Sequence, residues 1–187
     1  MGFTRLTPPA PPRSHFIKRL KKVETVPLRG HFFRLVLSVN ATAIEETGPS
    51  FVGGGRYNPP GEFGALYLSE SPALCWNEKM KQYNDRAEAI PLQTLGEFDV
   101  RITRCLDLTD ENVLKTLGLK TEDLTDLFSH NLPRMIGAAA WFLGIEALKV
   151  FSCVPVKEAK KNIVIFKDHL NPTSKIVLAK TSSYRLS

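Results

Sequence analysis

The chain has 187 residues, of which 43% are hydrophobic and 24% are charged, and this composition excludes wholesale disorder and a fibrous class. The length is sufficient for one well-buried domain and short for two. The formal net charge of +6 includes two basic clusters, at 18–22 and 157–161, which are not interleaved with aromatic residues as single-strand binders require. The charge therefore favours solvated faces, with a nucleic-acid surface or an acidic protein partner as the alternatives.

The three cysteines, Cys75, Cys105 and Cys153, are widely spaced within largely apolar segments and form no CxxC pair. No histidine stands at zinc-ligand spacing, so we expect free thiols, a reducing compartment and no structural metal. The N-terminus lacks the apolar core of a signal peptide, and no run approaches the roughly 18 apolar residues of a membrane helix. The sequence predicts a cytoplasmic protein without a membrane segment.

Residues 1–30 contain five of the thirteen prolines and a basic cluster, and we predict that they form an N-terminal extension. The domain is then expected to cover residues 31–187. Its first strand is predicted at 31–39, a segment that is dense in β-formers. Within this strand Arg34 lies between apolar neighbours, where a guanidinium is costly unless it is paired or its head reaches water.

Residues 41–63, rich in glycine and proline, are expected to form a long irregular connection, and connections of this length are usually functional or mobile. A short strand at 64–69 carries Tyr67. A serine that can serve as N-cap, followed by a proline, then predicts a helix over 72–83. Glu78 lies on this helix beside an apolar stripe.

In the second half of the chain, the sequence predicts more strands than helices. Residues 97–108 alternate between apolar and polar positions, as in a half-buried strand, and 133–143 form the most apolar predicted helix. Three further strands are expected, at 147–153, 162–166 and 175–180. Because strands and helices do not alternate regularly, we predict an α+β fold with a mainly antiparallel, twisted sheet flanked by helices.

The stretch from Phe51 to Glu78 contains the residues that indicate a chemical function. Its three consecutive glycines are not followed by the Gly-Lys-Ser/Thr ending of a P-loop, nor do they form the GxGxxG of a dinucleotide fold. Arg56, Tyr67 and Glu78 are spaced eleven residues apart, on the predicted loop, strand and helix. An arginine binds pyrophosphate, a tyrosine offers a stacking face, and a carboxylate stabilises an oxocarbenium-like centre. The three side chains together are suited to cleavage of a nucleotide's N-glycosidic bond.

A longer set of residues extends this pattern over most of the chain, from about residue 31 to 172. Its members are Phe33-Arg34, Gly54-Gly55-Arg56-Tyr57-Asn58, Gly61, Tyr67-Leu68-Ser69-Glu70-Ser71, Glu78, Lys149-Val150-Phe151-Ser152 and the segment that begins at Asn162. The set resembles the signature of the RES domain, a family named for an arginine, a glutamate and a serine.

The resemblance implies a fold similar to that of ADP-ribosyltransferases, in an enzyme that acts as the toxin of a bacterial toxin–antitoxin system. The enzyme is expected to cleave the nicotinamide–ribose bond of NAD+ and to pass ADP-ribose to inorganic phosphate or water, as an NAD+ phosphorylase or glycohydrolase. NAD+ is then a substrate, and no metal takes part. The implied partner is a cognate helix-turn-helix (Xre-like) antitoxin that covers the active site, so that nucleic acid is contacted only through the antitoxin.

The same resemblance implies roles for individual residues. Arg34 and Arg56 would hold the phosphates of NAD+ or orient its nicotinamide side. Tyr67 would stack near nicotinamide, Glu78 would contact the nicotinamide ribose and stabilise its developing positive charge, and Ser152 would complete the site. Three further residues are expected to contact NAD+, the last two as second choices: Gly55, Tyr57 and Asn58.

Other interpretations of these residues and of the function stay open. Glu78 can be a solvated helix residue, Tyr67 a core aromatic and Ser152 a strand-end hydroxyl. The alternative activities are protein ADP-ribosylation by a toxin and RNA 2′-phosphotransfer on a similar fold. An alternative from another class is a noncatalytic, basic nucleic-acid-binding module, whose affinity would fall steeply with salt and would not depend on Glu78.

Overall fold

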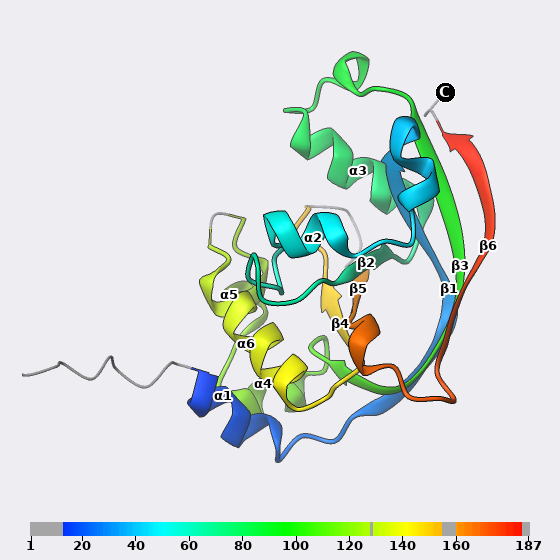
Figure 1. The fold of residues 1–187 in the computed structure, drawn as a ribbon. Coiled ribbons are helices and arrows are strands. Elements are labelled where there is room, and N and C mark those ends of the chain that lie inside the picture. The colour runs from blue at the N-terminus through cyan, green and yellow to red at the C-terminus, as the bar shows by residue number, and fades with distance from the viewer. Residues whose placement is uncertain (1–12, 128, 155–159, 185–187) are drawn as a thin grey trace, which may run out of the picture.

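The computed structural model describes residues 13–127, 129–154 and 160–184, and Figure 1 shows a sheet with helices on one side. The strands are β1 (Val26–Leu37), β2 (Leu66–Ser69), β3 (Gln93–Asp107), β4 (Ala147–Phe151), β5 (Lys161–Ile165) and β6 (Lys175–Tyr184). The α-helices are α1 (Arg13–Leu20), α2 (Gly48–Gly53), α3 (Pro72–Gln82), α4 (Glu111–Leu117), α5 (Thr121–Thr125) and α6 (Asn131–Phe142). Short 3-10 helices are η1 (Ser38–Ala43), η2 (Ala87–Ala89) and η3 (Lys167–His169).

The strands are hydrogen-bonded in the order β1-β2-β5-β4-β3-β6, and a further pairing of β1 with β3 closes five of them into a ring. Strand β3 pairs with β1 along one edge. Along its other edge, the first part of β3 pairs with β6 and its last residues pair with β4. The β3–β4 pairing is parallel and the other described pairings are antiparallel. The prediction of a mixed α+β fold is confirmed. The closure of the ring could not be inferred, because it depends on pairing between strands far apart in the chain.

Most predicted elements lie close to their expected positions. Strand 31–39 is found as β1, which begins earlier, at Val26, and strand 97–108 is found as β3, which begins at Gln93. The expectation of an irregular connection over 41–63 is wrong in part, because α2 lies within it. Pro49, in the first turn of α2, supplies a backbone angle that is compatible with a helix, and Gly54, at a φ of 69°, ends it.

Two apolar clusters pack on the two faces of the short strands β2, β4 and β5. One lies between β2, β5 and β4 and the long strands β1, β3 and β6, and includes Leu66, Phe98 and Ile163. The other packs the short strands against α1, α4 and α6. A third apolar cluster, under α3, contains Trp76. All three cysteines are free thiols, as the sequence predicts.

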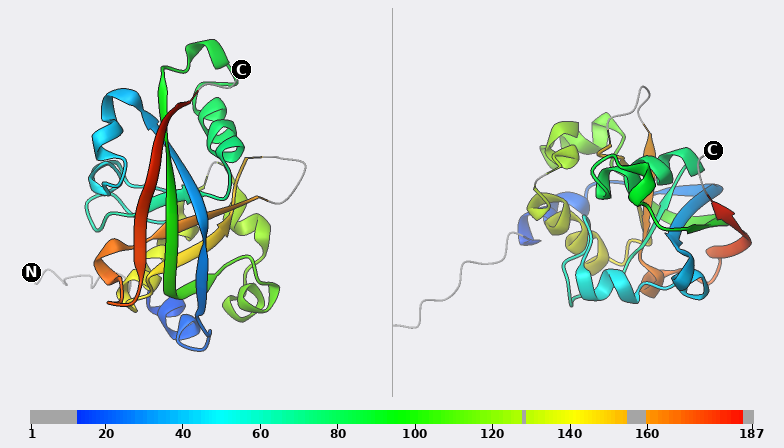
Figure 2. Two further views of the ribbon diagram at one scale, coloured as in Figure 1. Left: turned by 90° about the vertical axis from the view of Figure 1, so that its right-hand side faces the viewer. Right: turned by 90° about the horizontal axis from the view of Figure 1, so that it is seen from above.

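The N-terminal helix belongs to the helical layer, as the two views in Figure 2 show. Phe16 and Leu20 of α1 are buried in the cluster beside α6, and the guanidinium of Arg19 donates a hydrogen bond to the carbonyl oxygen of Leu117 at the end of α4. Residues 1–12 of the expected N-terminal extension lie outside the described residues. Within the described parts of the chain, no helix combines the length and the apolar character that a membrane span requires.

Helix α6 touches the backbone of the connection that follows α2. A Cβ atom on Gly137 would lie only 1.8 Å from the carbonyl oxygen of Tyr57. On the opposite side of the same connection, a Cβ atom on Gly55 would lie 2.4 Å from the hydroxyl of Tyr67. Residues 55–57 are therefore confined between α6 and β2, and both glycines are needed for this close approach.

We predict that Gly137→Ala lowers the free energy of unfolding by about 1–3 kcal/mol, because the added methyl group overpacks a contact with backbone that cannot rotate away. This loss is expected even though alanine has the higher intrinsic helix propensity, by about 1 kcal/mol. Urea denaturation measures the difference. Gly53→Ala is the matched control, since a Cβ atom there meets nothing within 4 Å; equal stability of the two variants would contradict the close approach.

Candidate active site

A cleft of about 520 Å³ opens between β1, η1, β2 and α3, with β5 contributing to its wall. Its volume is within the range of small-molecule sites. The polar and charged side chains that line it include Arg34, Tyr67, Ser69, Glu78, Lys79 and Asn162. Three of the residues that the sequence assigns to the site, Arg34, Tyr67 and Glu78, therefore share one cavity.

The carboxylate of Glu78 accepts hydrogen bonds from residues on separate strands. Its Oε1 atom accepts from Ser152 Oγ at 2.8 Å and from Asn162 Nδ2 at 2.6 Å, and its Oε2 atom lies 3.5 Å from the donor Ser69 Oγ. Ser69 and Asn162 stand directly opposite each other in the antiparallel pairing of β2 with β5. Ser152 follows β4, so Glu78 connects α3 to the ends of three neighbouring strands.

Helix α3 holds Glu78 in this position through its start and its buried face. The Oγ atom of Ser71 accepts a hydrogen bond from the Leu74 amide at 3.2 Å, which caps the helix as the sequence predicts. Leu74, Cys75 and Trp76 are buried and fix the rotation of the helix about its axis. Burial raises the pKa of the Cys75 thiol to about 11, so a neutral sulfur packs behind the carboxylate.

Tyr67 has two separate functions in the structure. Its ring lines the cleft, while its hydroxyl accepts a hydrogen bond from the Tyr57 amide and donates one to Asn58 Oδ1, both at 2.9 Å. Asn58 in turn donates from Nδ2 to the carbonyl oxygens of Ser50 and Phe63. Burial raises the pKa of Tyr67 above its ordinary value, so the hydroxyl remains protonated and holds the connection after α2 in place.

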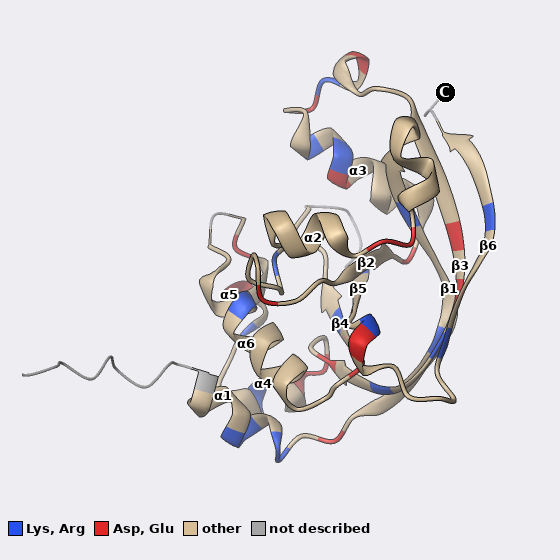
Figure 3. Ribbon diagram, in the orientation of Figure 1, with Lys and Arg blue, Asp and Glu red and all other residues tan. Residues whose placement is uncertain are grey.

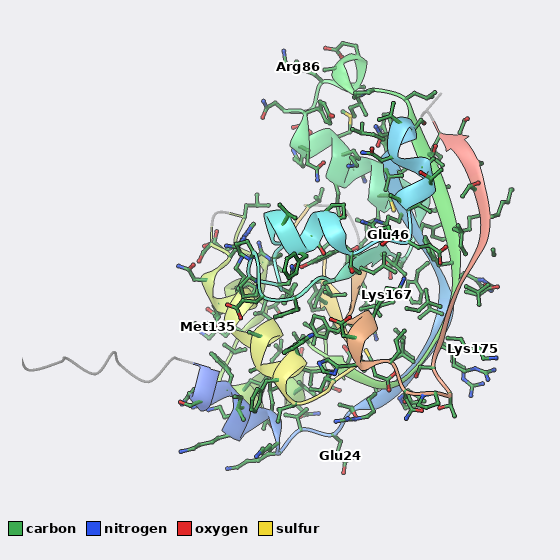
Figure 4. All side chains as sticks on the ribbon, in the orientation of Figure 1. Glu24, Glu46, Arg86, Met135, Lys167 and Lys175 are labelled. Atoms are coloured by element: carbon green, nitrogen blue, oxygen red, sulfur yellow. The ribbon has the colours of Figure 1, made fainter. Side chains whose placement is uncertain are left out.

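Arg34 is half-buried in the wall of the cleft. Its Nη1 atom donates to the carbonyl oxygens of Ile44 at 2.9 Å and Glu46 at 3.1 Å, on the segment between η1 and α2, where Figure 4 labels Glu46. Burial lowers the pKa of this guanidinium from its ordinary, very high value. An arginine carries five N–H donors, and among the described residues only Nη1 has a hydrogen-bond partner, so Nη2 and Nε can donate to a ligand in the cleft.

Arg56 extends towards α5 and is not among the residues that line the described cleft. It donates from Nε and Nη2 to the carbonyl oxygen of Leu124, at 3.0 and 2.6 Å, and from Nη2 to that of Asp126 at 2.6 Å. Arg134 of α6 donates from Nε to the Gly55 carbonyl oxygen at 2.9 Å. A second basic group therefore lies at the start of α6, where burial and then the charges of Arg56 and Arg134 lower the pKa of His130.

The remaining expected NAD+-binding residues lie behind Tyr67. Tyr57 and Asn58 are 1% and 0% exposed, so their side chains point into the protein, and Gly55 lies against the Tyr67 hydroxyl. Among the described residues, no group of three or more histidine, cysteine, aspartate or glutamate side chains could hold a metal ion. The structure thus brings Ser152 to Glu78 and places Arg56 near Arg134 and His130.

Several polar residues of the site received no role from the sequence. Ser69 could have been found, because it is two residues from Tyr67 on one strand and so faces the same side. Asn162 could not have been assigned to Glu78 without the β2–β5 register. Nothing in the sequence distinguishes Lys79 and Arg134 from other helical cations, and only the packing of α3 and α6 shows where they lie.

A family model for the RES domain matches residues 31–187. The chain belongs to the RES domain family. It is 33% identical over 103 residues to the NAD(+) phosphorylase MbcT of Mycobacterium tuberculosis and to that of Mycobacterium bovis. This match covers 52% of the chain and 54% of each relative, so it spans about half the length of these curated relatives.

The fold of this RES domain is similar to that of a solved structure, the MbcT–MbcA toxin–antitoxin complex of M. tuberculosis. The TM-score is 0.74 at 19% sequence identity, and the match covers 91% of this chain and 92% of the matched chain. At this identity the likeness concerns the fold. It extends over nearly the whole chain.

We predict that Tyr67→Phe destabilises the RES domain by about 1–3 kcal/mol, because the Tyr57 amide and the Asn58 side chain both lose their partner in a buried place. Thermal denaturation followed by circular dichroism measures the loss. Tyr83→Phe, at the end of α3, removes the same hydroxyl from a half-buried tyrosine and serves as control. A Tyr67→Phe protein as stable as this control would show that the hydroxyl does not hold the connection.

Proposed function

We propose that the protein is a toxin enzyme that binds NAD+ and cleaves its nicotinamide–ribose bond, passing ADP-ribose to inorganic phosphate or water. The observation that carries this proposal is the Glu78 carboxylate, which Ser152 and Asn162 orient in a cleft that Arg34 and Tyr67 also line. Membership of the RES domain family and the partial likeness to two NAD(+) phosphorylases support it. In this proposal the protein acts in the cytoplasm.

The proposed mechanism is dissociative. Nicotinamide leaves with the electrons of the C–N bond, and the ribose carbon develops positive charge that the nearby Glu78 carboxylate stabilises. The hydrogen bonds from Ser152 and Asn162 keep one carboxylate oxygen in place and leave the other close only to Ser69, so that it can contact a ribose hydroxyl. The Tyr67 ring offers a stacking face for nicotinamide.

The phosphates of NAD+ require cations, and two basic groups border Tyr67. Arg34 lies within the Glu78 cleft, while Arg56 lies with Arg134 near the start of α6. In the proposal Arg34 and Arg56 contact the phosphates or the nicotinamide side, and Gly55, Tyr57 and Asn58 shape the connection between these groups. The fold is proposed to be ADP-ribosyltransferase-like, with residues 31–187 as the catalytic domain and 1–30 as an N-terminal extension whose helix α1 packs onto that domain.

The proposed partner is a cognate helix-turn-helix (Xre-like) antitoxin that covers the cleft. The similar solved structure is a toxin–antitoxin complex, which supports a protein partner for this chain. Three exposed apolar side chains, Val39, Phe51 and Val52, are carried by η1 and α2, and both of these elements contribute to the cleft wall. An antitoxin placed over the cleft would cover them.

A nucleic-acid-binding function has one observation in its favour. Arg29, Arg101 and Lys175 are exposed and stand opposite one another across β1, β3 and β6, on the face where Figure 4 labels Lys175. Like charges in this register repel, so an anionic partner would stabilise them. Binding to nucleic acid that weakens steeply with salt and is unchanged by Glu78→Gln would support this second function.

Incubation of the purified protein with NAD+, with and without inorganic phosphate, tests the proposed function by product identification. We expect ADP-ribose 1″-phosphate with phosphate and ADP-ribose without it. Glu78→Gln should lower the rate by at least about 100-fold, since it keeps the shape and removes the charge that stabilises the transition state. The control is Glu88→Gln, an exposed glutamate of η2. Complete survival of NAD+, even with a protein acceptor present, would refute the proposal.

Expression in a bacterial host tests the toxin character separately. The wild-type protein is expected to arrest growth, whereas Glu78→Gln and Arg56→Ala are expected to permit it, because each removes a charge proposed to contact NAD+. Western blots of the soluble fraction show whether the variants accumulate as folded proteins. Growth arrest by a soluble Glu78→Gln variant would count against the role of this carboxylate.

A further inference from the structure

Lys79 lies beside Glu78 on α3 and lines the same cleft. Figure 3 shows that α3 carries neighbouring acidic and basic positions. The Lys79 side chain is half-buried, and its Nζ atom donates one hydrogen bond, at 3.3 Å, to Oε1 of Gln82, which is also a cleft residue. A primary ammonium has three donors, so two remain for a ligand.

The charged neighbours of Lys79 are Arg34 and the Glu78 carboxylate, and in the described part of the chain Lys79 forms no ion pair. Burial, followed by the positive charge of Arg34, lowers the pKa of Lys79. Within the described residues, neither Lys79 nor Arg34 has a carboxylate within 4.0 Å. Two cations in one partly desolvated cleft raise the free energy of the empty site, and an anion that enters between them lowers it.

Lys81, two residues further along the same helix, is a natural comparison. Its side chain is 46% exposed, and its Nζ atom forms an ion pair with Asp85 Oδ2 at 2.7 Å. A solvated lysine with such a partner is the ordinary state of a helical cation. Lys79 differs from it in burial, in the lack of an acidic partner among the described residues and in its place on the cleft wall.

Two anions could be held by this cation: the pyrophosphate of NAD+ or a separate phosphate. Of the two described basic residues that line the cleft, Arg34 and Lys79, the proposed function assigns Arg34 to NAD+, which leaves Lys79 for a separate anion. It is also the residue that directly follows Glu78, whose carboxylate acts on the reacting ribose carbon. An acceptor must approach this carbon, so a phosphate held by Lys79 would be in the right part of the cleft.

We propose that Lys79 binds inorganic phosphate as the acceptor of ADP-ribose and thereby selects phosphorolysis over hydrolysis. This inference rests on the proposed function. In the step, the C–N bond breaks and nicotinamide leaves as a neutral molecule with the electron pair. A phosphate oxygen of HPO₄²⁻ supplies the pair for the new C–O bond, and the phosphate proton passes to water according to the pH. Without bound phosphate, water attacks and releases one proton.

The test measures the ratio of ADP-ribose 1″-phosphate to ADP-ribose at several concentrations of inorganic phosphate, for the wild type and Lys79→Met. Methionine keeps an unbranched apolar stem and removes the charge. We expect Lys79→Met to raise the KM for phosphate by about 10- to 100-fold, the range of a charge-assisted hydrogen bond. The product ratio at low phosphate should fall by the same factor, and Lys79→Arg should restore most of it.

The ratio is formed within each reaction, so a general loss of folded or active enzyme does not change it. Lys81→Met removes a lysine charge from the same helix and should retain the wild-type ratio. An unchanged ratio in Lys79→Met would overturn the inference. So would a higher KM for NAD+ at an unchanged ratio, which would assign Lys79 to the pyrophosphate.

Failure of the proposed function would look different. If the wild type consumes NAD+ and yields only ADP-ribose at every phosphate concentration, the inference fails while NAD+ cleavage stands. If the wild type consumes no NAD+ under either condition, the proposed function fails and the inference falls with it. A phosphate-dependent ratio that depends on Lys79 and not on Lys81 supports both.

Discussion

The hydrogen bonds to the Glu78 carboxylate are the interaction on which the candidate active site depends. A carboxylate in a partly desolvated cleft needs donors, and here they come from Ser152 and Asn162, with Ser69 close by. These residues follow or belong to three neighbouring short strands. The site is therefore sensitive to strand register, because a shift of one residue in β2 or β5 would turn Ser69 or Asn162 to the opposite face.

A second constraint lies behind the cleft, where backbone approaches backbone. Gly137 of α6 contacts the Tyr57 carbonyl, and Gly55 contacts the Tyr67 hydroxyl, so residues 55–57 have no room to move sideways. The Tyr67 hydroxyl uses its hydrogen-bonding capacity on this connection, which leaves the ring as a rigid wall of the cleft. The same packing directs the Arg56 guanidinium to the carbonyl oxygens of α5.

Local sequence signals were sufficient for much of the secondary structure. The cap Ser71 and the following Pro72 predicted α3, the density of β-formers predicted β1, and alternation predicted β3. These signals are short-range, so they also left errors at the ends of strands and missed α2, whose six residues carry almost no periodic pattern. The ring closure between β1 and β3 joins residues more than fifty positions apart, and no local pattern encodes it.

By itself, the sequence determined the family, the α+β class and the chemical character of the stretch around Glu78, because these depend on residue types at fixed spacing. Only the tertiary structure decided which side chains meet. It brought Ser152 and Asn162 to Glu78, turned Tyr57 and Asn58 inward, bonded Arg56 to the carbonyl oxygens of Leu124 and Asp126, and added Lys79 to the cleft. The physical reason is that side-chain direction follows from strand register and helix rotation, and both are set by contacts between distant segments.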